Sequence, residues 1–210
     1  MTEDEINARI LLLNNPFIKG WMDRQLVSSY EDFIQILYRD LENVLSKVQE
    51  RKQIYGNASE DEITMFIVDL LQEKDYWAVH DEKLGGHVDI IVRRRETNYL
   101  WAAEAKRDKG AGWIEDGFRQ LTQRYSTGAE NQDRGCILVY VQGKSAKRIL
   151  QNWRTHLETL AKGDDFEELT ISDCLVKKDL AFLSKHSHES SGRTYHVRHL
   201  AVGLYHKPTV

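Results

Sequence analysis

The residues best suited to chemistry are an acid and a lysine that end the apolar segment 100–106. This segment reads Leu-Trp-Ala-Ala-Glu-Ala-Lys. In a β-strand, side chains two residues apart lie on the same face, so Glu104 and Lys106 are expected side by side. A buried charge is costly unless it is paired or binds a metal ion. Because the same acid-x-Lys pattern also occurs at residues 50–52 and 81–83, the surroundings must decide whether the pair is functional.

A second acid, Asp89, interrupts the apolar segment 88–92, which has the composition of a strand. The polar segment 93–98 joins it to the next strand as a hairpin, and antiparallel pairing can bring Asp89 to Glu104. Two carboxylates in contact repel each other unless a proton or a cation lies between them. Oxygen ligands of this kind favour Mg²⁺ or Mn²⁺, which acidifies a bound water. Lys106 could orient that water or stabilise the transition state of phosphodiester hydrolysis.

A third acid, Glu60, lies at the start of a predicted helix. Ser59 and Glu62 have the spacing of a capping box, which gives Glu62 a structural role. At 100° per residue, Glu60 falls on the apolar stripe of this helix. Two explanations stay open for an inward acid at this position, namely a favourable interaction with the helix dipole and membership of the site. The stripe consists of Ile63, Phe66, Ile67, Leu70 and Leu71.

The order of the predicted elements defines the fold class. After the helix come three strands in a meander, a helix, a strand buried on both faces and another helix. This order predicts an α/β fold whose sheet mixes antiparallel and parallel pairs. A turn at residues 188–193 predicts a C-terminal β-hairpin. The strands are expected at residues 76–80, 88–92, 99–105 and 136–141, and the helices at 113–125 and 145–160, the last capped by Ser145.

The 210 residues divide into a core and two extensions. Residues 1–56 are expected to form a helical N-terminal extension, broken near residues 14–16 and with a capping box at residues 28–31. Residues 57–162 would form the core, and residues 163–210 a β-rich extension packed on it. The N-terminal helices are expected to pack on the main domain or on a partner.

Composition limits the class of protein. The chain is 41% hydrophobic and 30% charged, and it lacks the roughly 18 consecutive uncharged apolar residues of a membrane span, so no membrane contact is expected. The N-terminal segment 1–5, Met-Thr-Glu-Asp-Glu, is acidic and does not resemble a signal peptide, and Cys136 and Cys174 are expected as reduced core thiols. These features predict a cytoplasmic location. The net charge of −4 argues against coating nucleic acid by bulk charge.

Over about residues 57–142 the sequence resembles the PD-(D/E)xK nuclease superfamily. The match consists of residues 86–89, Gly-His-Val-Asp, followed by residues 104–106, Glu-Ala-Lys. A histidine stands where the motif has a proline. The resemblance implies a restriction-endonuclease-like core with this order of elements.

The resemblance also implies roles for individual residues. Asp89 and Glu104 would bind Mg²⁺ or Mn²⁺, with the Ala105 carbonyl as a third ligand, and Lys106 would be the catalytic lysine. Glu60 matches the acid on the first core helix of Holliday-junction-resolvase-like members, where it joins the metal site.

Two residues of the following helix complete the comparison. Gln120 and Tyr125 resemble the Gln and Tyr of RecB-like and Cas4-like members, but their spacing is one residue longer than usual. Gln120 is expected near the site in contact with substrate, and Tyr125 is expected in the core.

The implied activity is that of a metal-dependent endodeoxyribonuclease, by analogy a restriction or phage-defence effector. Two alternatives stay open. One is a non-catalytic module that binds nucleic acid or protein, against which the intact site positions argue. The other is a resolvase of branched DNA, which would need a broad basic face. DNA is the expected partner, and an activating protein and a homo-oligomer formed through the N-terminal helices stay open.

Basic residues flank the predicted site and fit a cleft for polyanionic DNA. They lie at residues 93–95 and 106–109, and Arg119 and Arg124 are expected to extend the cleft. Trp113 could stack on a base. The alternative is a structural role, either in the core or at the start of the helix.

Five of the eight histidines lie in the last 25 residues. A zinc site and a phosphate-contacting hairpin are alternatives here, and a solvated face is the favoured interpretation.

Overall fold

The computed structural model describes residues 2–207, apart from the side chains of residues 6, 8, 9, 12 and 13. Residue 1 and residues 208–210, the ends of the two predicted extensions, lie outside the described residues. The chain forms two compact units, one up to Leu41 and one from Glu42 onward, and each is described by itself. No helix within residues 2–207 is long and apolar enough to cross a membrane.

The first unit is helical. It contains α1 (Glu3–Asn14), α2 (Pro16–Gln25) and the first part of α3 (Tyr30–Glu50). The chain breaks between α1 and α2 because Asn15 caps α2, accepting a hydrogen bond at Oδ1 from the Phe17 amide at 2.9 Å. The cap of α3 lies one residue later than predicted, since the Ser29 hydroxyl accepts from the Asp32 amide.

The second unit contains a seven-stranded mixed sheet, which confirms the predicted α/β class. Its strand order is β1-β2-β3-β4-β7-β6-β5. The β1–β2–β3 meander and the β7–β6–β5 part are antiparallel, whereas β3–β4 and β4–β7 are parallel. Short β5 was not predicted. The strands are β1 (Trp77–Lys83), β2 (His87–Arg93), β3 (Leu100–Arg107), β4 (Arg134–Val141), β5 (Thr170–Asp173), β6 (Ala181–Ser187) and β7 (Thr194–Gly203).

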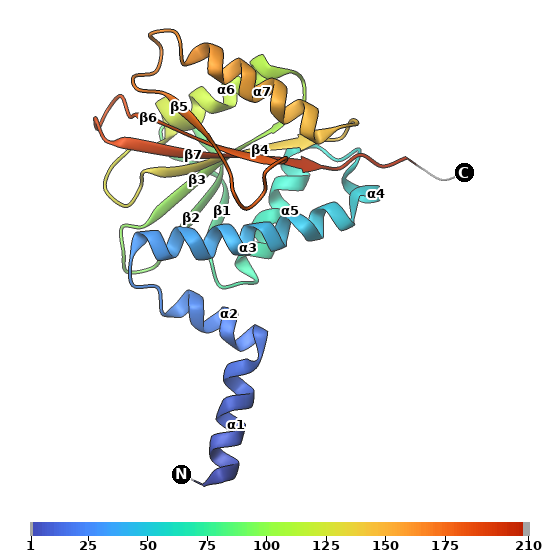
Figure 1. The fold of residues 1–210 in the computed structure, drawn as a ribbon, viewed down its shortest axis with the longest axis vertical. Helices are drawn as coiled ribbons and strands as arrows, with labels where there is room; N and C mark the ends of the chain where they lie inside the picture. Colours follow the sequence, from blue (N-terminus) through green and yellow to red (C-terminus); the bar gives the residue numbers. More distant parts are fainter. Residues whose placement is uncertain (1, 208–210) are drawn as a thin grey trace. The chain divides into compact units, whose positions relative to one another are not determined.

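Helices cover both faces of this sheet. Figure 1 shows α6 (Ala111–Arg119) and α7 (Ala146–Leu160) on one face and α5 (Glu60–Gln72) on the other. A short α4 (Lys52–Tyr55) precedes α5. From Gly135 onward every residue of β4 is buried, as expected for a strand between two layers. The core on the α6 and α7 face includes Ile114, Phe118, Leu121, Ile137, Val139, Leu150 and Trp153.

Two predictions about helix 113–125 and helix 145–160 need correction. The first helix is α-helical only to Arg119 and continues as the π-helix η1 (Gln120–Tyr125). The second begins after Ser145, but the Ser145 side chain makes no capping bond, and this residue has a left-handed φ of 68°.

The start of α5 is fixed from two sides. The predicted capping box is present, with the Ser59 amide donating to Glu62 Oε2 at 2.7 Å and the Glu62 amide donating to Ser59 Oγ at 3.2 Å. Just after β4, the side-chain Nε2 of Gln142 donates to the backbone carbonyls of Tyr55 (2.9 Å) and Ala58 (2.8 Å). These bonds hold the first turn of α5, and therefore Glu60, at the edge of the sheet where β4 ends.

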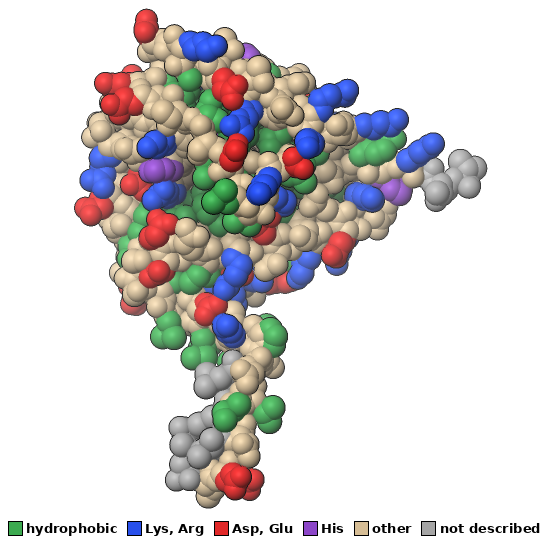
Figure 2. Space-filling model, viewed as in Figure 1, with side chains coloured by type: hydrophobic (Ala, Val, Ile, Leu, Met, Phe, Trp, Pro, Cys, Tyr) green, Lys and Arg blue, Asp and Glu red, His purple; other side chains and the backbone are tan. Residues whose placement is uncertain are grey.

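The distribution of charge over the surface is mixed. Figure 2 shows acidic and basic side chains interspersed over most of one face, with Lys and Arg gathered on the side where the chain leaves β7.

The capping box predicts a measurable loss of stability. Ser59→Ala removes the cap, so the free energy of unfolding in urea should fall by about 1 kcal/mol. Ser145→Ala is the matched control, because the Ser145 side chain makes no capping bond to the helix that follows it, and this substitution should cost much less. Equal losses of unfolding free energy in the two variants would contradict the assignment of Ser59 as the cap of α5.

Candidate active site

Asp89 and Glu104 meet where the β2–β3 ladder ends. The last backbone pair of this ladder is Ile90 with Ala103, so Asp89 and Glu104 occupy the next facing positions. Here a side chain replaces the backbone partner, because the Ala105 amide donates to Asp89 Oδ2 at 2.7 Å. The Asp89 carboxylate therefore lies against the backbone of β3 beside Glu104.

Lys106 lies among the carboxylates. Its Nζ donates to Glu104 Oε1 at 2.5 Å and is 3.9 Å from Glu60 Oε1. The other oxygen of Glu60 accepts a hydrogen bond from the Arg107 amide at 2.6 Å. The structure thus brings together Glu60 from α5, Asp89 from β2 and the 104–106 segment of β3. The other two acid-x-Lys matches, at residues 50–52 and 81–83, have exposed lysines.

Close packing of α6 buries the ion pair. A Cβ built on Gly117 would lie 2.8 Å from Cγ and Cε of Lys106 and 3.1 Å from Cγ of Glu104. Only glycine lets the helix approach β3 this closely. As a result, Glu104 is 2% exposed and Lys106 8% exposed. The sequence analysis missed this role of Gly117, and the only signal for it was a glycine on the packed side of a helix.

Burial and mutual repulsion alter the protonation of the cluster. Burial, followed by the charge of Asp89, raises the pKa of Glu104 to about 8. Burial raises the pKa of Asp89 to about 6 against the opposing hydrogen bond from Ala105. Burial lowers the pKa of Lys106, but the carboxylates of Glu104, Asp89 and Glu60 together outweigh it, and the net pKa is raised. The cluster therefore stabilises a proton or another cation near neutral pH.

One oxygen of the site has no partner. Glu104 Oε2 is buried and makes no hydrogen bond with the described residues. An unpaired buried carboxylate oxygen is costly, and a cation would satisfy it. Within residues 2–207, no three or more His, Cys, Asp or Glu side chains are arranged to hold a metal ion. The predicted ligands were Asp89, Glu104, Glu60 and the Ala105 carbonyl, but one oxygen of Glu60 accepts from the Arg107 amide and the other faces Lys106. Glu104 Oε2 is the atom of this set that fits a hard cation.

The π-helix accounts for the unusual spacing of Gln120 and Tyr125. A π-helix bonds residue i to residue i+5, so Tyr125 lies one turn after Gln120 despite the extra residue. Gln120 follows Gly117 by three residues and so shares its side of the helix, and its buried Oε1 has no partner among the described residues. Tyr125 is buried, as predicted, and its ring packs on Gly86, where a Cβ would lie 2.3 Å from Cε1. Burial, followed by the Glu104 charge, raises the pKa of Tyr125.

A buried hydroxyl pair lies beneath Glu60. The Thr64 hydroxyl donates to the Glu60 carbonyl at 2.8 Å and lies 3.0 Å from the Tyr140 hydroxyl of β4. Both side chains are buried. This pair joins α5 to the centre of the sheet, and its only signal in the sequence was a threonine within an apolar stripe.

Arg119 and Arg124 were expected to extend a basic cleft, and Arg124 is exposed, but Arg119 is largely neutralised. Its Nε lies 2.7 Å from Glu115 and its Nη2 lies 2.5 Å from Asp165, so two carboxylates hold the guanidinium. Trp113 lies in the first turn of α6, two residues after its start, and is 40% exposed, so it does not enter the core.

The solvated face predicted for the C-terminal histidines is also wrong for three of them. His186, His188 and His199 are at most 3% exposed. Trp153 Nε1 donates to His199 Nδ1 at 3.0 Å, and the Ser184 hydroxyl lies 2.8 Å from Nε2. Both ring nitrogens are thereby used, and burial lowers the pKa of His199 to about 3. His199 is a neutral core residue.

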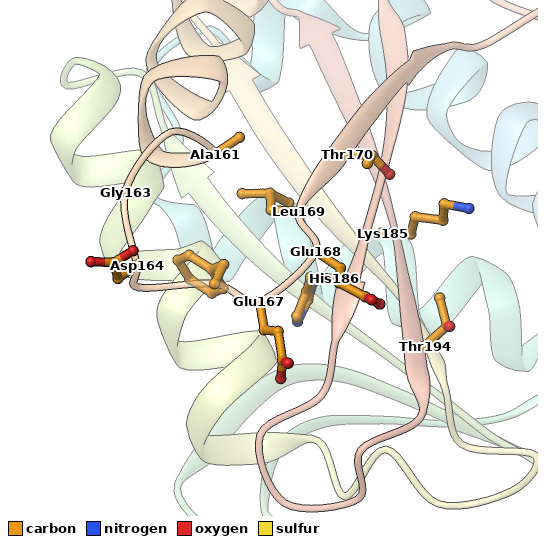
Figure 3. A pocket seen from close by; sticks show the side chains of 11 residues that line it. Ala161, Gly163, Asp164, Glu167, Glu168, Leu169, Thr170, Lys185, His186 and Thr194 are labelled. Carbon is orange, nitrogen blue, oxygen red and sulfur yellow. The ribbon is translucent and has the colours of Figure 1, made fainter.

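A hollow of about 840 Å³ lies between the loop after α7 and strands β6 and β7, with His186 in its wall. Figure 3 shows its side chains, with Asp164, Glu167 and Glu168 from the loop and Lys185 from β6. Three carboxylates against one ammonium disfavour a polyanion. The residues that line it include none of the predicted site residues, so the site is assigned at the end of β3.

The close approach of α6 can be tested with two glycines of the same helix. Gly117→Ala forces the Lys106 side chain to move, so the free energy of unfolding should fall. Gly112→Ala is the control, because a Cβ there meets nothing within 4 Å, and it should raise the free energy of unfolding by up to about 1 kcal/mol. Urea denaturation of both variants measures the sign of each change in unfolding free energy. A rise in stability for both variants would contradict the close packing of α6 on β3.

The raised pKa of Glu104 predicts a dependence of stability on pH. The ordinary pKa is 4.5 and the folded pKa about 8. The protonated carboxyl therefore stabilises the fold below about pH 4.5, and this contribution is lost as the pH rises to about 8. Glu104→Gln cannot ionise, so its unfolding free energy relative to wild type should rise over this window and then level off.

Urea denaturation at a series of pH values measures this trend. Glu62→Gln is the control, because the backbone hydrogen bond from Ser59 lowers the pKa of Glu62 and its titration falls below the window. If the difference in unfolding free energy between Glu104→Gln and wild type did not change with pH, the raised pKa of Glu104 would be contradicted.

The site is defined by burial, the Glu104–Lys106 ion pair and the unpaired Glu104 oxygen. Comparison of the chain with protein-family models, with curated proteins and with solved structures found no match.

Proposed function

We propose that the protein is a metal-dependent endodeoxyribonuclease with a restriction-endonuclease-like core, akin to the PD-(D/E)xK superfamily. The observation that supports this best is the buried Glu104–Lys106 pair with Asp89 opposite it at the end of a hairpin. Burying Glu104 and Lys106 beside the half-buried Asp89 opposes folding unless the charges pair completely, so a function in chemistry is a reason to retain them. The unpaired Glu104 oxygen indicates that the pairing is incomplete.

Each residue has a role in this proposal. A bound Mg²⁺ or Mn²⁺ would supply an acidified water and neutralise charge on the phosphate. Asp89 and Glu104, with the Ala105 carbonyl, are the oxygens that would hold it. Lys106 donates a hydrogen bond to a phosphate oxygen or orients the attacking water, and its carboxylate neighbours keep it charged.

Two further residues support the reaction. Glu60, 3.9 Å from Lys106 Nζ, holds the ammonium at the sheet edge. The unpaired amide oxygen of Gln120 is a candidate contact for the substrate. By analogy alone, the small core with helical and β-rich additions is that of a restriction or phage-defence effector.

One observation favours a second candidate, a non-catalytic binding module. The Lys106 ammonium already neutralises one carboxylate, so the cluster carries less charge than a bare metal site. A module of this kind would bind nucleic acid and leave it intact with every divalent metal.

A plasmid-nicking assay tests the proposal. Supercoiled DNA should be nicked with Mg²⁺ or Mn²⁺ and stay intact with a chelator. Lys106→Ala and Glu104→Ala should each reduce the rate by about 100-fold or more while circular dichroism stays that of the folded chain. Lys83→Ala is the control, because Lys83 belongs to the same acid-x-Lys pattern but is exposed.

Two results would overturn the nuclease assignment. Nicking at the wild-type rate without metal would exclude the metal mechanism, and binding without cleavage across all metals would favour the module. Preferred cleavage of four-way junctions over linear duplex would instead support the branched-DNA resolvase.

A further inference from the structure

Exposed aromatic rings lie beside lysines at the edge of the sheet that carries the candidate site. Lys109 Nζ lies 4.4 Å from the centre of the Trp113 ring, and Lys144 Nζ lies 5.8 Å from that of Tyr205. Lys106 Nζ is itself 6.0 Å from the Trp113 ring. Trp113 is 40% exposed and Tyr205 38% exposed. Both rings are therefore accessible to a flat ligand next to the site.

The topology places these pairs in one row. β3, β4 and β7 are parallel neighbours, so their C-terminal ends lie on the same edge. Lys109 follows β3, Lys144 follows β4, and Tyr205 follows β7. Backbone bonds tie the row together, from the Asp108 amide to the Tyr140 carbonyl (3.0 Å) and from the Leu204 amide to the Val141 carbonyl (2.7 Å). The row spans two strand spacings, roughly 10 Å.

The row carries free positive charge. Neither Lys109 nor Lys144 has a carboxylate partner among the described residues, and each contacts a ring instead. Figure 2 shows Lys and Arg side chains gathered on the side where the chain leaves β7. By contrast, Arg119 and Lys147 elsewhere are each paired with an acid. The row is thus suited to a polyanion.

Lysines beside exposed rings suit unpaired nucleotides rather than a duplex. Phosphates bind the cations, and bases stack on the rings with little sequence preference. In a duplex the faces of the bases are covered by their neighbours, so the rings would find no partner. We propose that the substrate enters as an unpaired strand across the ends of β3, β4 and β7, with bases stacked on Trp113 and Tyr205. This inference rests on the proposed nuclease function and specifies its substrate.

The chain contains a matched control for the stacking. Trp77 is 49% exposed, and the Arg93 guanidinium lies 5.8 Å from its ring. Trp77 pairs with Arg93, and Arg93 pairs with Leu100 at the start of β3, so this ring lies at the opposite edge of the sheet. Arg93 is also neutralised by Glu82 at 2.5 Å. Trp77 is thus an exposed ring beside a cation, as Trp113 is, but its cation is neutralised and it lies at the opposite end of the strands.

The test measures binding by the full chain in chelator, without cleavage. Fluorescence anisotropy with labelled single-stranded DNA, single-stranded RNA and blunt duplex of one sequence should show tighter binding of one or both single strands than of the duplex. Trp113→Ala and Tyr205→Ala should each weaken single-strand binding by about 5- to 150-fold, the equivalent of one lost base stack. Trp77→Ala should leave binding unchanged.

The outcomes separate this inference from the proposed function. Duplex bound as tightly as single strands, or an equal loss in Trp113→Ala and Trp77→Ala, would overturn the inference even if the protein nicks plasmid. Selective single-strand binding without metal-dependent cleavage would retain the surface and reject the nuclease. Tyr205→Ala repeats the test on a residue outside helices and strands, where a folding defect is not expected.

Discussion

The ion pair between Lys106 and Glu104 is the constraint around which the end of the sheet is organised. It lies beneath α6, and burial acts against both charges. Asp89 and Glu60 add two more carboxylates, so the region carries more negative than positive charge. A fold that keeps such a cluster loses stability there and must recover it in the apolar layers around β3 and β4.

Three sets of contacts outside the cluster set its geometry. Gly117 determines how closely α6 approaches β3, and the side-chain amide of Gln142 fixes the start of α5. The Thr64–Tyr140 contact then joins α5 to the central strand. None of these side chains carries a charge, yet together they decide whether Glu60, Asp89 and Lys106 face one another.

Local patterns predicted much of this arrangement from the sequence. Alternation placed Glu104 and Lys106 on one face, hairpin geometry placed Asp89 opposite Glu104, and helical periodicity placed Glu60 inward. Each of these relations spans few residues or a single turn, so a period of 2 or 3.6 determines it. Their chemical roles remain a prediction.

Relations between distant residues could not be predicted. Arg119 pairs with Asp165, 46 residues later, and no periodicity links the two. The C-terminal hairpin was predicted, but its pattern did not reveal that β7 pairs with β4. The burial of His186 and His199 was not predicted for the same reason, because it depends on contacts with Phe118 of α6 and Trp153 of α7. The odd spacing of Gln120 and Tyr125 was visible in the sequence, but only the backbone explains it as a π-helix.

The position of β7 has a consequence for how the sheet is made. β7 lies between β4 and β6, although it is the last of the seven strands in the chain. Until residues 194–203 are synthesised, β4 and β6 each present an edge without a neighbour. Assembly of the central sheet must therefore wait for this strand, and pairing over such a sequence separation is slow. A nascent or truncated chain that stops before β7 would expose β4, a strand of almost entirely apolar residues, to aggregation.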